Sequence, residues 1–148
     1  MKIFIVAILL SLSFCKCKYF SAGSYPYAEI YKVNISEDSL IEILTAIKKN
    51  DSSIIPPFEL HLNDGKDDST DHWYSFYFLN KSQNEIYFTW VRAETKSVTN
   101  FAFVSVSDGL RTGHWKRINR DFNDVDNGFK KKEFNSLIVD RIKDKLIR

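Results

Sequence analysis

The chain has 148 residues, of which 44% are apolar and 27% are charged. This length and this balance fit one folded domain and exclude an intrinsically disordered chain. The formal net charge is +2, divided between residues 1–110, with 10 basic and 13 acidic side chains, and residues 111–148, with 11 and 6. So small a charge does not indicate a nucleic-acid partner, and we expect none. Aromatic residues reach 15%, which predicts a core built largely from rings.

After Met1 and Lys2, the N-terminus contains a predominantly apolar run of twelve residues, Ile3–Phe14. A transmembrane helix needs roughly 20 apolar residues, so this run is too short to cross a bilayer. It has the length of the apolar region of a secretory signal peptide. We therefore expect residues 1–17 to be a signal segment and the protein to be exported to the cell envelope.

Residues 12–15 read LSFC and contain Cys15, one of only two cysteines in the chain. This segment resembles the lipobox of bacterial lipoproteins, although Phe14 stands where that class has a small residue. The resemblance implies cleavage before Cys15, acylation of that cysteine and anchoring of the protein in a membrane through its N-terminal lipid. The alternative is ordinary cleavage near Gly23, which would leave a periplasmic protein. Either cleavage leaves the folded domain free of cysteine, which excludes a structural disulfide, a thiol nucleophile and a thiolate metal site.

Residues 18–27 contain Ser, Gly and Pro and predict a tether, so we place a single domain at residues 28–148. In residues 28–35, apolar and polar side chains alternate as they do in a strand with one apolar face. Ser36 is a suitable N-cap for a following helix that ends at Lys48, Lys49 and Asn50, with apolar residues at helical spacing. Two prolines then indicate a connector, and residues 58–62 (FELHL) predict a short strand.

The runs 72–79, 85–93 and 99–107 are aromatic and β-branched and are joined by short polar segments, which predicts an antiparallel meander of three strands. In the first run, Trp73 and Tyr77 fall on one phase, and Phe76 and Phe78 on the other. Because neither phase is polar, we expect this strand to be central, either with both faces covered or with one face forming a hydrophobic groove.

After Gly128, apolar residues at 134, 137, 138 and 142 predict a C-terminal amphipathic helix over residues 129–147. The expected fold is therefore α+β: an antiparallel β-meander sheet with an N-terminal strand–helix unit and a C-terminal amphipathic helix.

No catalytic motif is evident, and the three histidines, His61, His72 and His114, lack metal-ligand spacing. We therefore expect no cofactor and no metal, and favour a non-enzymatic protein. A calcium site formed by Asp124, Asp126 and Glu133 stays open, although the spacing does not match a calcium-binding loop.

The segment RTGHWKRINR interleaves cations with an aromatic ring, a combination that suits phosphate, carboxylate or anionic lipid. Its candidate binding residues are Arg111, His114, Trp115, Lys116, Arg117 and Arg120. The alternative interpretation is that Trp115 is a core residue and the cations merely flank it.

Taken together, these patterns predict a small exported, lipid-anchored envelope protein that acts as a non-enzymatic binding module for an envelope protein or an anionic ligand. An immunity or inhibitor protein is one concrete version. The first alternative is a small hydrolase or metal-dependent enzyme that uses His, Asp and Glu from distant parts of the chain. The second is a carrier of an apolar ligand, in an open pocket lined by Tyr74, Phe76, Phe78, Phe88 or Trp90.

Overall fold

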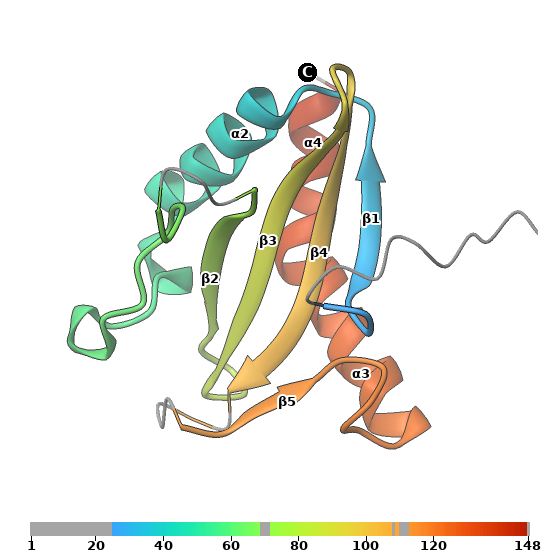
Figure 1. Ribbon diagram of the computed structural model, residues 1–148. Coiled ribbons are helices and arrows are strands. Elements are labelled where there is room, and N and C mark those ends of the chain that lie inside the picture. Colours follow the sequence, from blue (N-terminus) through green and yellow to red (C-terminus); the bar gives the residue numbers. More distant parts are fainter. Residues whose placement is uncertain (1–24, 69–71, 108, 110–112, 148) are drawn as a thin grey trace, which may run out of the picture.

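The computed structural model describes residues 25–68, 72–107, 109 and 113–147. In this part of the chain an antiparallel sheet carries helices on one face, and α4 passes behind β3 and β4 in Figure 1. The expected α+β class is confirmed. Cys15, Arg111 and residues 18–24 of the expected tether lie outside the described residues.

The sheet has five strands: β1 (Glu29–Val33), β2 (Tyr74–Asn80), β3 (Glu85–Thr95), β4 (Val98–Ser107) and β5 (Trp115–Arg117). Their order is β1-β4-β3-β2, with β5 pairing with the last residues of β4. The meander β2–β3–β4 is confirmed. The expectation that the first of these strands is central is wrong, because β2 lies at the edge of the sheet.

The edge of β2 is covered by the loop that precedes it, which explains why an edge strand can be apolar on both phases. Gly65 exchanges two backbone hydrogen bonds with Ser75, of 2.7 and 2.9 Å. The backbone N–H of Tyr77 donates to Asp64 Oδ1 at 3.0 Å, and Lys48 Nζ donates to the Tyr77 carbonyl at 2.9 Å. Lys48 also pairs with Asp64, so helix, loop and strand edge are joined at one point.

Helix α2 (Glu37–Asn50) begins where the sequence predicts, because the Ser36 side chain accepts a hydrogen bond from the backbone N–H of Ser39. The segment FELHL was expected to be a strand, and this is wrong. Its first three residues form the 3-10 helix η3 (Phe58–Leu60), which follows η2 (Ser52–Ile54). Pro57 leads into η3, and His61, at φ 52°, ends it in the left-handed region.

The C-terminal helix starts five residues earlier than predicted. It runs through α3 (Asp124–Phe134), a π-helical segment η4 (Asn135–Val139) and α4 (Asp140–Leu146). Asn123 is its N-cap and accepts from the backbone N–H of Asp126, so Gly128 lies inside the helix instead of before it. A strong cap and two aspartates in the first turn outweigh the modest cost of one exposed glycine.

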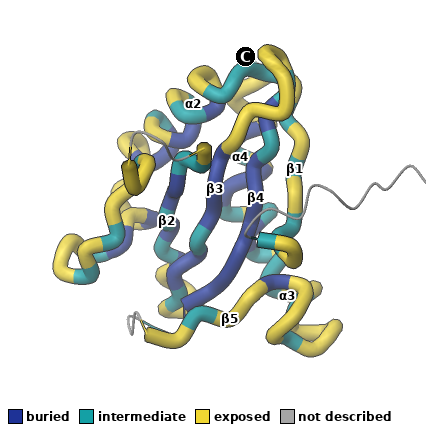
Figure 2. Tube along the Cα trace, viewed as in Figure 1, coloured by how far each residue is buried: buried dark blue, intermediate teal, exposed yellow. Residues whose placement is uncertain are grey.

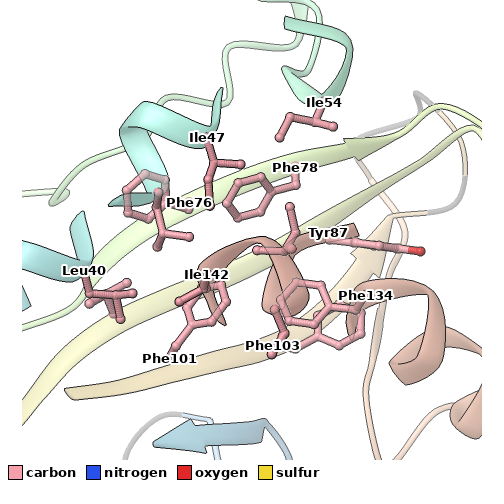
Figure 3. Close-up of a cluster of buried hydrophobic side chains, with 14 of the residues drawn as sticks. Leu40, Ile47, Ile54, Phe76, Phe78, Tyr87, Phe101, Phe103, Phe134 and Ile142 are labelled. Carbon is pink, nitrogen blue, oxygen red and sulfur yellow. The ribbon is translucent and has the colours of Figure 1, made fainter. Parts of the chain in front are cut away.

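The inner face of the sheet, defined as the face that the helices cover, forms the main core (Figure 3). Phe134 of α3 is fully buried and stacks on Phe103 of β4, with ring centroids 4.2 Å apart and planes at 10°. Other buried residues of this core include Leu40 and Leu44 of α2, Phe76 and Phe78 of β2, Tyr87 of β3, and Ile138 and Ile142. Burial is concentrated along β3 and β4, as Figure 2 shows.

A bulge in β4 alters which side chains reach the opposite face. Phe88 pairs with Ser105 and Thr89 with Phe103, so Val104 is an extra residue with no partner on β3. Such a bulge lets two consecutive residues share one face.

In the described part of the chain, no helix combines the length and the apolarity that crossing a bilayer would require.

Candidate binding site on the outer face of the sheet

The outer face is the side of the sheet opposite the helices, and it carries a hollow of about 440 Å³. Strand alternation brings its residues together. Tyr77 of β2 pairs with Phe88 of β3, Phe88 with Ser105 of β4, and Ser105 with Arg117 of β5. One row across four strands therefore faces the hollow, and the bulge adds Val104 beside Ser105.

Aromatic rings form much of the wall. The rings of Tyr77 and Phe88 stack with centroids 5.1 Å apart, and the Trp115 ring lies 6.2 Å from each. Tyr25 meets Phe88 edge-on at 5.8 Å and Trp73 at 6.0 Å. All five rings are only partly buried, so each presents surface to the hollow.

Residues 25–27, which we expected to belong to the tether, pack against the domain. Besides the contacts of Tyr25, the carbonyl of Tyr27 accepts from Asn119 Nδ2 at 3.1 Å, and the Arg120 guanidinium lies 4.9 Å from the Tyr27 ring centroid. Tyr25 is thus part of the wall of the hollow, while Tyr27 is held against Asn119 and Arg120.

The three tryptophans of the sequence all belong to this side of the molecule. Trp73 and Trp115 line the hollow, and Trp90 is buried beside it in a small cluster with Ala102 and Val104. The Tyr25 ring lies 6.3 Å from that of Trp90. Trp90 Nε1 is buried and has no hydrogen-bond partner within the described residues. Intrinsic tryptophan fluorescence therefore reports on the outer face alone.

The hollow also contains polar groups that can bond to a ligand. Ser75 and Ser105 line it at 8% and 4% exposure, and their hydroxyls make no hydrogen bond with other described residues. Arg117 is held by Asp121, whose Oδ2 accepts from the backbone N–H of Arg117 at 2.8 Å and from its Nε at 3.1 Å. These bonds lower the pKa of the Asp121 carboxyl, while the terminal guanidinium nitrogens of Arg117 keep no partner in the described part of the chain.

Asp67 completes the polar rim. Its exposed carboxylate forms no ion pair with any residue that the structure describes. Burial raises the pKa of the Tyr77 hydroxyl, and the charge of Asp67 raises it further. The Tyr77 hydroxyl is therefore a neutral hydrogen-bond donor at ordinary pH.

The segment predicted to bind is divided by the alternation of β5. Trp115 and Arg117 line the hollow. Lys116 lies instead against Phe122, with Nζ 5.8 Å from the ring centroid, and Arg120 Nε is 3.8 Å from Asp121 Oδ1. His114 is exposed just before β5.

The residues expected to line a carrier pocket are divided in the same way. Tyr74, Phe76 and Phe78 belong to the inner core or pack against it, whereas Phe88 lines the hollow and Trp90 lies beside it. The sequence grouped Trp73 with Tyr77 by phase, and that grouping was the signal for the outer face.

The enzymatic alternative requires histidines and carboxylates that lie close together. His61, His72 and His114 line neither the hollow on the outer face nor the hollows beside α4. Asp126 accepts from the Asn123 side chain, and Glu133 Oε2 accepts from Asn80 Nδ2 at 2.8 Å. Among the residues that the structure describes, no three His, Cys, Asp or Glu side chains lie close enough to hold one metal ion.

The two hollows beside α4 offer less chemistry to a ligand. One, of about 450 Å³, lies between the end of α2 and α4, where Arg141 donates to Asp51 at 2.7 Å. Hydrogen bonds from Ser53 and then from Arg141 lower the pKa of the Asp51 carboxyl, so these charges already satisfy one another. The other, of about 520 Å³, is a mainly apolar groove between β1 and α4.

Comparisons of the chain with protein-family models, with curated proteins and with solved structures find no match in any of the three.

Proposed function

We propose that this chain is an exported, lipid-anchored envelope protein that acts as a non-enzymatic binding module through the outer face of its sheet. The observation that carries the binding role is the aromatic hollow, where Tyr77, Phe88 and Trp115 surround polar groups that lack partners among the described residues. A hollow lined mainly by apolar and aromatic side chains, with a few convergent polar groups, is the usual form of a ligand site.

The anchor rests on the leader and on Cys15. Acyl chains contribute roughly 0.8 kcal/mol per buried CH₂, so a multiply acylated cysteine holds a protein at a membrane. With such an anchor, the domain lies close to the membrane surface, where its ligand would be another component of the envelope.

The anchor is tested with paired cysteine variants in a bacterial host supplied with labelled palmitate. We expect Cys15→Ser to abolish incorporation of label and to accumulate as the unprocessed chain. Cys17→Ser, two residues away, is the matched control and should be labelled like the wild type. Equal labelling of both variants, or none in the wild type, would refute the lipoprotein assignment and favour cleavage near Gly23.

The binding face is tested by photo-crosslinking in cells. The photoreactive residue p-benzoylphenylalanine is placed at Tyr77, which lines the hollow, and in a separate variant at Phe58, which is 81% exposed on η3 and does not line it. We expect a crosslinked product from position 77 and none from position 58. The same products from both positions, or none from position 77, would show that the hollow is not the binding surface.

A further inference from the structure

The polar groups inside the aromatic hollow restrict the chemistry of its ligand. We propose that the hollow binds a neutral saccharide unit of a glycan, with one sugar face stacked on the aromatic rings and its hydroxyls bonded to Ser75, Ser105, Asp67 and Arg117. This inference rests on the proposed function, because it names the ligand of the same face.

The rings provide the stacking surface. Tyr77 and Phe88 are nearly parallel, with planes at 22°, and Trp115 flanks both. The face of an aromatic ring is electronegative, and the C–H bonds on one side of a sugar ring form a flat, weakly electropositive patch. A ring face that stays exposed to the hollow can therefore take the C–H face of a sugar ring.

The two serine hydroxyls in the hollow disfavour a purely apolar ligand. The hydroxyls of Ser75 and Ser105 lie within the hollow and have no partner among the described residues. An acyl chain would cover both hydroxyls and leave them unpaired, which weakens binding. A sugar hydroxyl both donates and accepts, so it can pair with a serine hydroxyl in either direction.

The charges argue against a strongly ionic ligand. Arg117 supplies one positive charge, but Asp121 is bound to it, and Asp67 at the rim forms no ion pair within the described residues. An anionic ligand would therefore meet the Asp67 carboxylate in the lining of the hollow, and a cationic ligand would meet the Arg117 guanidinium. A neutral ligand avoids both repulsions and uses both groups, since Asp67 accepts hydrogen bonds and the terminal nitrogens of Arg117 donate them.

The size of the hollow is compatible with this ligand. Its volume of about 440 Å³ lies within the roughly 300–1,000 Å³ typical of small-molecule sites. The hollow is not an enclosed cavity, so a sugar unit of a longer chain need not be buried on all sides.

The test uses the full-length chain on an array of immobilised glycans, followed by titration with chitobiose, cellobiose and maltose. Tryptophan emission is the readout, because Trp73, Trp90 and Trp115 all belong to the outer face. We expect retention on the array and a saturable change in emission with at least one disaccharide. Parallel titrations use palmitate, phosphocholine and a proline-rich peptide.

Matched variants locate the binding. Ser105→Ala removes one of the two serine hydroxyls in the hollow and should weaken saccharide binding about 3- to 10-fold, the loss typical of one hydrogen bond. The same substitution would leave palmitate binding unchanged or tighten it, so the sign of its effect identifies the ligand class. Phe58→Ala, away from the hollow, should bind like the wild type.

The proposal is overturned if no glycan is retained, if only palmitate, phosphocholine or the peptide changes the emission, or if Ser105→Ala binds the saccharide as tightly as the wild type. A crosslink from position 77 to a protein, without glycan binding, would refute the saccharide ligand and leave the binding module intact. Failure of both experiments would refute both proposals.

Discussion

The two faces of the sheet are both rich in aromatic residues, but they differ in what covers them. On the inner face, Phe134 of the C-terminal helix is fully buried and stacks on the fully buried Phe103 of β4. On the outer face, Tyr77, Phe88 and Trp115 are partly exposed and enclose a hollow with polar groups. The same residue types thus serve stability on one face and, we propose, recognition on the other.

The largest expected effect is on the inner face. Phe134→Ala should lower the free energy of unfolding by about 3–5 kcal/mol, because it removes a fully buried ring that packs against four others. Urea or thermal denaturation measures the loss. Phe129→Ala, in the same helix but 46% exposed, is the control and should change stability little. Similar losses for both variants would contradict this account of the core.

At the edge of β2, the expected effect on the free energy of unfolding is intermediate. Asp64→Ala removes the acceptor of the Tyr77 backbone N–H and the partner of Lys48, which should cost about 1–3 kcal/mol. The loop it anchors also carries Leu62 and Asp67 of the hollow, so binding should weaken as well.

Hydrogen exchange of the Tyr77 amide measures the detachment of this edge directly. Lys66→Ala, whose ion pair with Glu37 spans 3.8 Å at the surface, is the matched control and should leave that amide protected. Unchanged exchange in Asp64→Ala would mean that the loop does not hold the edge.

On the outer face the expected cost to stability is smaller. Trp115→Ala should lower the free energy of unfolding by no more than about 1–2 kcal/mol, because the ring is only partly buried. Its effect on ligand binding should be larger, since Trp residues often dominate binding energy. Denaturation and glycan-array binding of one sample compare the two effects. A loss of stability as large as that of Phe134→Ala would mean that Trp115 belongs to a second hydrophobic core on the outer face.

The smallest expected effect is at alkaline pH. Burial, and next the charge of Glu29, raises the pKa of Tyr31 to about 12, so the folded protein keeps this hydroxyl protonated after the unfolded chain has begun to ionise. The unfolded state then binds fewer protons, and stability should fall as the pH rises from about 10 to 12.

Tyr31→Phe removes this ionisation and should flatten the alkaline decline seen in denaturation curves. Tyr77→Phe should flatten it less, because the pKa of Tyr77 is raised to a smaller extent. The same slope in wild type and Tyr31→Phe would contradict the burial of the Tyr31 hydroxyl.

Local patterns in the sequence determined much of the fold. The alternation and short polar joints of residues 72–107 predicted the meander, and Ser36 predicted the start of α2. These features depend on interactions between residues close in the chain, which a single sequence displays. Apolar spacing also predicts the C-terminal helix, but it places the start after Gly128, whereas the Asn123 cap starts the helix at Asp124.

Only the tertiary structure decided which face each phase occupies. The sequence separated Trp73 and Tyr77 from Phe76 and Phe78, but it did not show that helices would cover the second pair alone. Likewise, Trp115 and Arg117 face the hollow because β5 pairs with β4, a pairing that the sequence does not show. Tyr25 joins them from the other end of the chain. Long-range pairing and burial carry this information because they depend on residues distant in sequence, whereas aromatic residues occur on both faces.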